Sequence, residues 1–411
     1  MTVAKKRARV WFVDVVRLIA SFQMINGHTL DVLMVDELRQ GPVFERYTFM
    51  RGLVSVAFLT VAGLAFHLAT LARFDAHRAS PTEVKKRFRR AGILLLLGYL
   101  LRFPGEGLFG EGAAAAASWS YFFTCGVLQC IGVALFLLEA ATVLAKRPQH
   151  VVIFAGLCAA FFIGLAPWMH HVPLVGAWRP FTAYLTHAGG SLFPLFPWAG
   201  YMFAGCVLGW VTLPEGGTTP LGTAIPRLAG AAVVAGLAWQ GLELLGPLGP
   251  EDTHHSTHVA FAVQKLASVI GIVLLAIVTA PLESLPKLLR IVSAETLFVY
   301  VFHLWVLYAS FLGIEQRWGH QVQLPVALGG PVAMMVLTVS ANAAWHRRQD
   351  PIARSAAAGA PPRRPPRAGC PGAGAVISSM APPSRSSAPS TSRPLGDGAR
   401  LVRRAGAGRG V

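Results

Sequence analysis

Long apolar segments follow one another through the first 346 residues of this 411-residue chain and set the tightest limit on its fold. A helix needs about 20 mostly apolar residues to cross the hydrocarbon core of a bilayer. The sequence holds about ten such segments, near residues 11–33, 52–72, 91–104, 119–144, 150–168, 191–212, 228–245, 259–281, 293–313 and 323–345. We therefore predict an all-α fold, a polytopic membrane bundle of about ten transmembrane helices over residues 1–346.

Composition agrees with a membrane bundle and excludes a soluble enzyme. Charged residues make up 13% of the chain, whereas soluble proteins carry about 25%. The net charge of +17 could suggest a nucleic-acid ligand, but residues 347–411 alone hold 12 Arg and 2 Asp. Most other basic residues gather in short loops, where membrane proteins carry their orientation signals. We expect contact with membrane lipid and none with nucleic acid.

The distribution of Lys and Arg predicts the orientation. With the N-terminus inside, the inner segments hold 16 basic residues and the outer segments hold six, as the positive-inside rule requires. We expect a protein of the cytoplasmic (inner) membrane, with the N-terminus and the C-terminal residues in the cytoplasm. Residues 347–411 are rich in Arg, Pro, Ala, Gly and Ser without periodicity, which predicts either a disordered tail or a frame-shifted, non-natural sequence.

The first apolar segment carries several polar residues. Ionisable groups inside a membrane cost roughly 2.5–3.5 kcal/mol each and face a bundle interior or a water-filled cavity. Asp14 and Arg17 are three positions apart, so they share a helix face and can pair, either in a functional site or as an interfacial anchor. Asn26 and His28 follow, and His28 lies roughly 25 Å along the helix, in the outer leaflet. His28 is a candidate functional residue or a hydrogen-bonded packing residue.

A second intramembrane histidine, His303, lies about ten residues into the ninth segment, with Tyr300 one turn earlier on the same face. Two histidines in the outer half of one bundle could line one cavity. Imidazole can accept a proton from an attacking hydroxyl or amine, or can take an acyl group itself. The alternative is a structural hydrogen-bonded pair between His303 and Tyr300.

Two further patterns have ordinary explanations. The outer-loop string His254-His255-Ser256-Thr257-His258 could bind a metal, but a solvated polar loop explains it as well, and we predict no metal site. The inner run Lys85 to Arg90 could bind the phosphates of a nucleotide-containing donor such as coenzyme A, but the orientation signal already accounts for it. The residues that would bind a cofactor are therefore not assigned.

Several strings, in order, resemble the heparan-α-glucosaminide N-acetyltransferase-like family of polytopic membrane acyltransferases, in its bacterial branch. They cover residues 9–310, and the sequence departs from the family pattern at Leu18 and at Cys130. The strings are Asp14-Val-Val-Arg17, Met24-Ile-Asn26-Gly27-His28-Thr29, Arg51-Gly52 with Phe58 to Gly63, Gly126-Val-Leu-Gln129-Cys-Ile-Gly132, Phe196-Pro197-Trp198-Ala-Gly200, and Tyr300-Val-Phe-His303.

The resemblance implies transfer of an acyl group from cytoplasmic acyl-CoA, a co-substrate that is not tightly bound, to a sugar acceptor across the membrane. Asp14 and Arg17 match the family's first-span motif, and His28 matches the polar residue that ends that span. On this basis His28 and His303 are the candidate catalytic residues. Arg51 would position the acceptor, with Asp14, Arg17, Asn26 and Tyr300 in support.

Two other functions use the same polar residues. A transporter or flippase of a small or lipid-linked molecule would use them as a binding site near the bilayer midplane, although the sequence shows no convincing internal repeat. A non-catalytic membrane scaffold is the third possibility. The acyl chain, the acceptor and the oligomeric state do not follow from the sequence.

Overall fold

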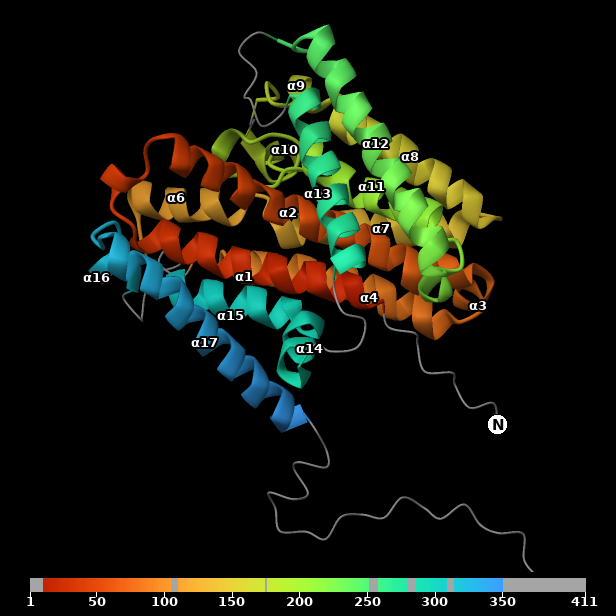
Figure 1. The fold of residues 1–411 in the computed structure, drawn as a ribbon. Helices are drawn as coiled ribbons and strands as arrows, with labels where there is room; N and C mark the ends of the chain where they lie inside the picture. The colour runs from red at the N-terminus through yellow and green to blue at the C-terminus, as the bar shows by residue number, and fades with distance from the viewer. Residues whose placement is uncertain are drawn as a thin grey trace, which may run out of the picture. The chain divides into compact units, whose positions relative to one another are not determined.

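The computed structural model describes residues 10–104, 110–173, 176–250, 258–279, 286–308 and 314–349. All of these residues belong to one compact unit, Met1–Gly359. Their regular structure is helical, with one isolated bridge between Met34 and Val322 (Figure 1). The all-α prediction is thus confirmed for the described part of the chain. The predicted tail lies outside it, except that residues 347–349 end the last helix.

The helices follow the apolar segments of the sequence. The longer ones are α1 (Trp11–Leu33), α2 (Pro42–Ala69), α4 (Pro81–Leu100), α6 (Gly112–Phe122), α7 (Val127–Leu144), α8 (Pro148–Gly164), α11 (Leu195–Thr212), α12 (Leu221–Leu245), α13 (Val259–Thr279), α14 (Lys287–Ala294), α15 (Thr296–Tyr308) and α17 (Leu324–Gln349). The shorter ones are α3 (Phe74–Arg78), α9 (Ala166–Met169), α10 (Arg179–Thr182) and α16 (Ile314–Trp318). Single 3-10 turns occur at η1 (Asp36–Leu38), η2 (Leu71–Arg73), η3 (Gly176–Trp178), η4 (Ala188–Gly190) and η5 (Gly216–Thr218).

Five segments of the described chain are long and apolar enough to cross a membrane, namely Pro42–Arg78, Ala115–Leu144, Leu195–Thr212, Leu221–Leu245 and Val259–Thr279. A sixth is the pair Leu288–Ala294 and Thr296–Tyr308, which is bent by 85°. The described residues therefore support five or six spans where the sequence predicts about ten. Of the remaining predicted spans, α1 and α4 carry charged residues and α8 has only 17 residues.

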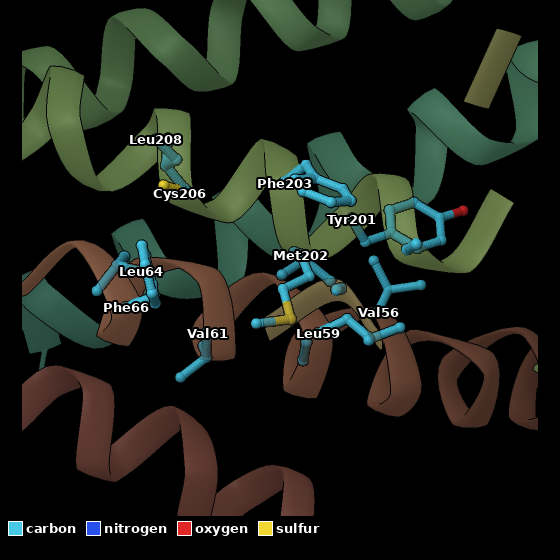
Figure 2. Packing of buried hydrophobic residues seen from close by; sticks show 14 of the residues in the cluster. Val56, Leu59, Val61, Leu64, Phe66, Tyr201, Met202, Phe203, Cys206 and Leu208 are labelled. Carbon is cyan, nitrogen blue, oxygen red and sulfur yellow. The ribbon is translucent and has the colours of Figure 1, made fainter. Parts of the chain in front are cut away.

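The most extensive helix contact joins α2 to α11. Gly63 and Gly205 let the two backbones approach: a Cβ atom at Gly63 would lie 1.8 Å from the Met202 carbonyl oxygen, and one at Gly205 would lie 2.0 Å from that of Thr60. Small residues allow such close packing of membrane helices. Figure 2 shows the buried side chains of this contact, including Val56, Leu59, Val61, Leu64, Phe66, Tyr201, Met202, Phe203, Cys206 and Leu208.

Helix α1 packs against helices from both ends of the chain, since it contacts α2 as well as α13, α14, α15 and α17. In Figure 1 it runs beside α15 and α17. Its buried side includes polar residues such as Asp14, Ser21 and Thr29. Polar groups are costly in contact with lipid tails, so their enclosure by neighbouring helices is the expected solution.

We expect Gly63→Ala and Gly205→Ala each to lower the free energy of unfolding by about 2–3 kcal/mol, because the added methyl group forces two packed backbones apart. The midpoint of thermal unfolding in detergent micelles measures the effect. Gly236→Ala is the matched control, since a Cβ atom at this position of α12 meets nothing within 4 Å and alanine favours helix. An unchanged midpoint for Gly63→Ala would contradict the packing described here.

Candidate functional site

The two histidines singled out from the sequence lie side by side where α1 packs against α15. The ring centroids of His28 and His303 are 5.4 Å apart, with the ring planes tilted by 44°. His28 Nδ1 lies 3.3 Å from the hydroxyl oxygen of Tyr308, and the ring of Tyr300 lies 6.0 Å from that of His303. Two imidazoles and two phenols from opposite ends of the chain therefore form one cluster.

His303 is held in a defined orientation and tautomer. The residue is fully buried, and its Nδ1–H donates a 2.6 Å hydrogen bond to the carbonyl oxygen of Val299, one turn earlier in α15. In a neutral imidazole, a proton on Nδ1 leaves a lone pair on Nε2. Nε2 has no hydrogen-bond partner among the described residues. His303 thus offers a free basic nitrogen beside His28.

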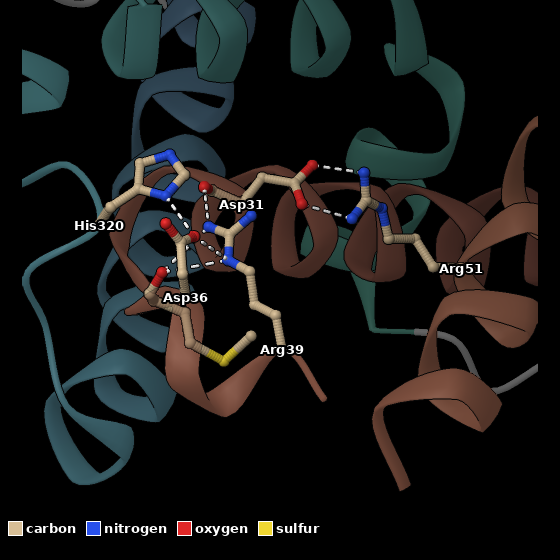
Figure 3. Close-up of polar contacts among 6 residues, drawn as sticks. Asp31, Asp36, Arg39, Arg51 and His320 are labelled. Atoms are coloured by element: carbon tan, nitrogen blue, oxygen red, sulfur yellow. Dashed lines mark hydrogen bonds and ion pairs between the residues drawn. The ribbon is translucent and has the colours of Figure 1, made fainter. Parts of the chain in front are cut away.

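An ion pair fastens α1 to α2 near these rings. Arg51 donates two hydrogen bonds to the Asp31 carboxylate, one from each terminal nitrogen (Figure 3). The aliphatic part of Arg51 packs on Gly27, where a Cβ atom would lie 3.1 Å from Arg51 Cδ. Arg51 thus packs against the turn of α1 that carries His28. Arg51, which was predicted to position the acceptor, thus pairs with Asp31. Asp31 was not predicted as a site residue, although it follows His28 by three positions on the same helix face.

The end of α1 next to this pair is closed by Arg39. Its guanidinium donates to the carbonyl oxygens of Asp31 at 2.6 Å and of Met34 at 3.0 Å, which satisfies acceptors that a helix end leaves open. Residues 320 and 322 also pair with the backbone of α1 through bonds to Val32 and Leu33. His320 Nδ1–H donates at 2.9 Å to Asp36, and this hydrogen bond lowers the pKa of the Asp36 carboxyl below its usual range.

The other supporting residues predicted from the sequence lie elsewhere on α1. Asp14 and Arg17 approach to 3.9 Å, as their spacing predicts. Asp14 precedes His28 by 14 residues of one helix, about 21 Å along the axis, so the structure does not bring this pair to the histidines. Asn26 is half-buried, and positions two apart on a helix do not share a face. It therefore does not join His28 on one side of α1.

Further intramembrane polar residues join helices to one another. His67 is buried, and its Nε2–H donates to the Leu213 carbonyl oxygen at 2.9 Å. Glu139 accepts a 2.6 Å hydrogen bond from His77, which ties α3 to α7. Lys265 of α13 is buried, and its Nζ lies 5.8 Å from the centroid of the Trp198 ring in α11. These contacts explain the side chains as interhelical fastenings.

The structure offers no metal centre among the residues it describes. His254 and His255 of the histidine-rich loop lie outside the described residues. The hollows of the described chain include one lined by residues 242–248 and 258–261 in part and one between α6 and residues 176–180. Neither of these two is lined by His28 or His303.

The fold and the cluster define a class, a helical membrane protein with paired imidazoles among its helices. Residues 9–243 match the family described as heparan-alpha-glucosaminide N-acetyltransferase, catalytic, and the chain belongs to this family. Its members are N-acetyltransferases that use acetyl-CoA as the donor. No curated protein matches the chain. The match does not distinguish branches of the family, and it ends before α15, so His303 lies outside the matched segment.

We expect Asp31→Asn and Arg51→Gln each to lower the free energy of unfolding by about 1–2 kcal/mol, because each leaves a charged partner without its hydrogen bonds in a partly exposed site. A double-mutant cycle on unfolding midpoints in detergent should show coupling, with the double variant no worse than the poorer single variant. Arg51→Lys should lower the free energy of unfolding nearly as much as Arg51→Gln does, because a lysine ammonium group cannot form the two parallel hydrogen bonds of the guanidinium. Arg46→Lys, at an exposed position of α2, is the control, and strictly additive effects would contradict the pairing.

Proposed function

We propose that this protein is an integral membrane acetyltransferase that moves an acetyl group from acetyl-CoA to a hydroxyl or amine of an envelope saccharide or a similar acceptor. The observation that carries the proposal is the free Nε2 of His303, held beside His28 by the bond from Nδ1 to Val299. Family membership supports acetyl-CoA as the donor. The acceptor class is our inference.

In direct transfer, the acceptor oxygen or nitrogen attacks the thioester carbonyl carbon while His303 Nε2 takes its proton. The carbon–sulfur bond breaks, and the CoA thiolate leaves and recovers the proton from the imidazolium. In a relay, an imidazole nitrogen attacks the carbonyl carbon first and the carbon–sulfur bond breaks, so CoA leaves as the thiolate. The acceptor then attacks the acetyl-imidazole and the carbon–nitrogen bond breaks, while the acceptor's proton passes through an imidazole nitrogen to the CoA thiolate. The unpartnered nitrogen suits both routes.

The neighbouring residues have supporting roles in this scheme. Tyr308 lies within hydrogen-bonding distance of His28, so its hydroxyl can fix the orientation of that ring. The pair of Arg51 and Asp31 holds the outer ends of α1 and α2 together beside the reacting groups. Because Asp31 offsets much of the positive charge of Arg51, the electrostatic attraction of Arg51 for an acceptor is reduced. Asp14 and Arg17 order the opposite end of α1.

The topology belongs to the proposal as well. Basic residues predict that both termini lie in the cytoplasm, with about ten spans in a bacterial inner membrane. In that arrangement α1, α4, α8 and α17 cross the membrane or fill the bundle together with the five or six apolar spans. Acetyl-CoA would then approach from the side of Lys85 to Arg90, and the acceptor from the side of Arg51.

One observation favours a second candidate, a transporter or flippase. The bend of 85° between α14 and α15 is a broken helix pair, and broken helices line substrate sites in many transporters. His303 lies on the second half of this pair. Uptake of a substrate by proteoliposomes in the absence of acetyl-CoA would favour that function over the acetyltransferase.

We expect His303→Asn to slow acetyl transfer strongly without unfolding the protein. Asparagine can keep a side-chain N–H donor toward Val299, but it lacks the basic nitrogen at the Nε2 position. Loss of a general base should slow the transfer of radiolabelled acetyl groups to glucosamine-type acceptors by about 100- to 10,000-fold. His28→Ala should also lose activity, whereas His150→Ala, at an exposed position of α8, should keep it.

The same assay separates the two chemical routes and tests the proposal as a whole. Label bound to the protein after incubation with acetyl-CoA alone, and absent from His303→Asn or from His28→Ala, identifies the relay. Transfer with no protein-bound label identifies direct attack. Full activity of a correctly folded His303→Asn variant would contradict the assignment of the base.

A further inference from the structure

Arg102 is a charged residue at the end of α4 that no acidic side chain of the described chain neutralises. Its Nη1 donates a 3.3 Å hydrogen bond to the amide oxygen of Gln129. Its guanidinium carbon lies 5.4 Å from the centre of the Tyr121 ring. Its Nε is buried and has no acceptor among the described residues. A cation among membrane helices normally has a negatively charged partner, so Arg102 is a candidate binding residue for an anionic ligand.

Gln129 presents a second donor with no acceptor. The side chain is 1% exposed. Its Oε1 accepts from the backbone N–H of Gly126 at 3.1 Å as well as from Arg102. These two donors fix which amide atom is the oxygen, so the opposite atom is the NH₂ group. This Nε2 has no partner among the described residues, and a buried donor left in this way is unfavourable.

The contact between Arg102 and Gln129 depends on two glycines. A Cβ atom at Gly126 would lie 2.1 Å from Arg102 Nη1, and one at Gly98 of α4 would lie 2.4 Å from Gln129 Oε1. Any other residue at either position would displace one partner. Residues from α4, from the loop before α7 and from α7 itself are thus combined into a set of hydrogen-bond donors. The two unpartnered donors, Arg102 Nε and Gln129 Nε2, belong to the two side chains that this hydrogen bond joins.

This set of donors belongs to the neighbourhood of the histidine cluster. Arg102 and Tyr121 are both close enough to Tyr300 to act on it electrostatically. Tyr300 in turn lies against His303, with ring centroids 6.0 Å apart. Tyr121 also acts on Tyr308, the residue that contacts His28. Tyr121, whose ring lies 5.4 Å from the Arg102 guanidinium carbon, and Tyr300, which lies against His303, thus link the two groups of residues electrostatically.

We propose that Arg102 and Gln129 bind a phosphate or carboxylate group of the acceptor, which makes the acceptor an anionic saccharide. The inference rests on the proposed acetyltransferase function and adds a specificity determinant to it. Every open group in the set is a donor, and a guanidinium binds the paired oxygens of such anions through parallel hydrogen bonds. A neutral sugar hydroxyl would leave the charge of Arg102 uncompensated.

The location on α4 favours the acceptor over the donor. The basic run Lys85 to Arg90 is suited to the phosphates of CoA and lies at the start of α4. Arg102 follows Arg90 by 12 residues, about 18 Å along a helix axis. The two sets of positive charge are thus separated along the axis of α4, with Arg102 directly after its C-terminal end.

Binding is tested first without any catalytic step. Glucosamine 6-phosphate, glucosamine, glucuronate and CoA are titrated at millimolar concentrations into the full-length protein in detergent, and both the thermal midpoint and the dissociation constant are measured. We expect the two anionic sugars to stabilise the protein and glucosamine to have little effect. Arg102→Gln should weaken binding of the anionic sugars by at least about tenfold, and Arg46→Gln should leave it unchanged. Gln129→Leu, which keeps Arg102, gives a second variant of the site.

Transfer assays then separate this inference from the proposed function. Transfer to glucosamine 6-phosphate should have a KM at least about tenfold higher in Arg102→Gln, with the KM for glucosamine unchanged. Sugar-phosphate binding that depends on Arg102, without transfer to any acceptor, would support the site while removing the acetyltransferase proposal. Equal binding of charged and neutral sugars, or loss of CoA binding alone in Arg102→Gln, would overturn the site assignment.

Discussion

The structure depends on one constraint, that the polar side of α1 must be kept away from lipid. Asp14, Arg17, His28 and Asp31 all lie on this helix, and each would be costly against hydrocarbon. The chain answers by surrounding α1 with α2, α13, α14, α15 and α17. This enclosure brings α15 and its histidine to His28. The same packing that protects the helix thus brings the two imidazoles together.

Hydrogen bonding fixes the orientation and the tautomer of His303 in this cluster. The bond from His303 to Val299 uses one ring nitrogen and leaves the other without a partner in the described part of the chain, so the protein itself fixes the tautomer of this ring. The pair of Asp31 and Arg51 likewise fixes the position of α1 relative to α2, because two parallel hydrogen bonds between a carboxylate and a guanidinium allow little rotation. Reactions between bound groups gain from positions fixed in advance.

Much of this arrangement follows from the sequence, and what does not has a physical reason. Apolar periods and intramembrane polarity predicted the helices and the meeting of His28 with His303. The pairing of Arg51 with Asp31 was missed because a sequence shows which charges exist but not which neighbour will neutralise them. Arg102 was missed as well, because only its contacts with Gln129 and Gly126 show it as part of a donor set. The described residues show five or six apolar spans where about ten were predicted, since α1 and α4 carry charged residues and α8 has only 17 residues.

The distance in sequence between α1 and α15 has a consequence for biogenesis. About 270 residues separate the first imidazole from the second, and a ribosome adds roughly 5–20 residues per second. For tens of seconds after α1 emerges, its hydrophilic stripe has none of its final C-terminal neighbours. Nascent chains must therefore shelter this helix in the insertion machinery or against α2 until synthesis nears completion. Mutations that loosen α1 from α2 should then reduce the yield of assembled protein more than they reduce the stability of the finished molecule.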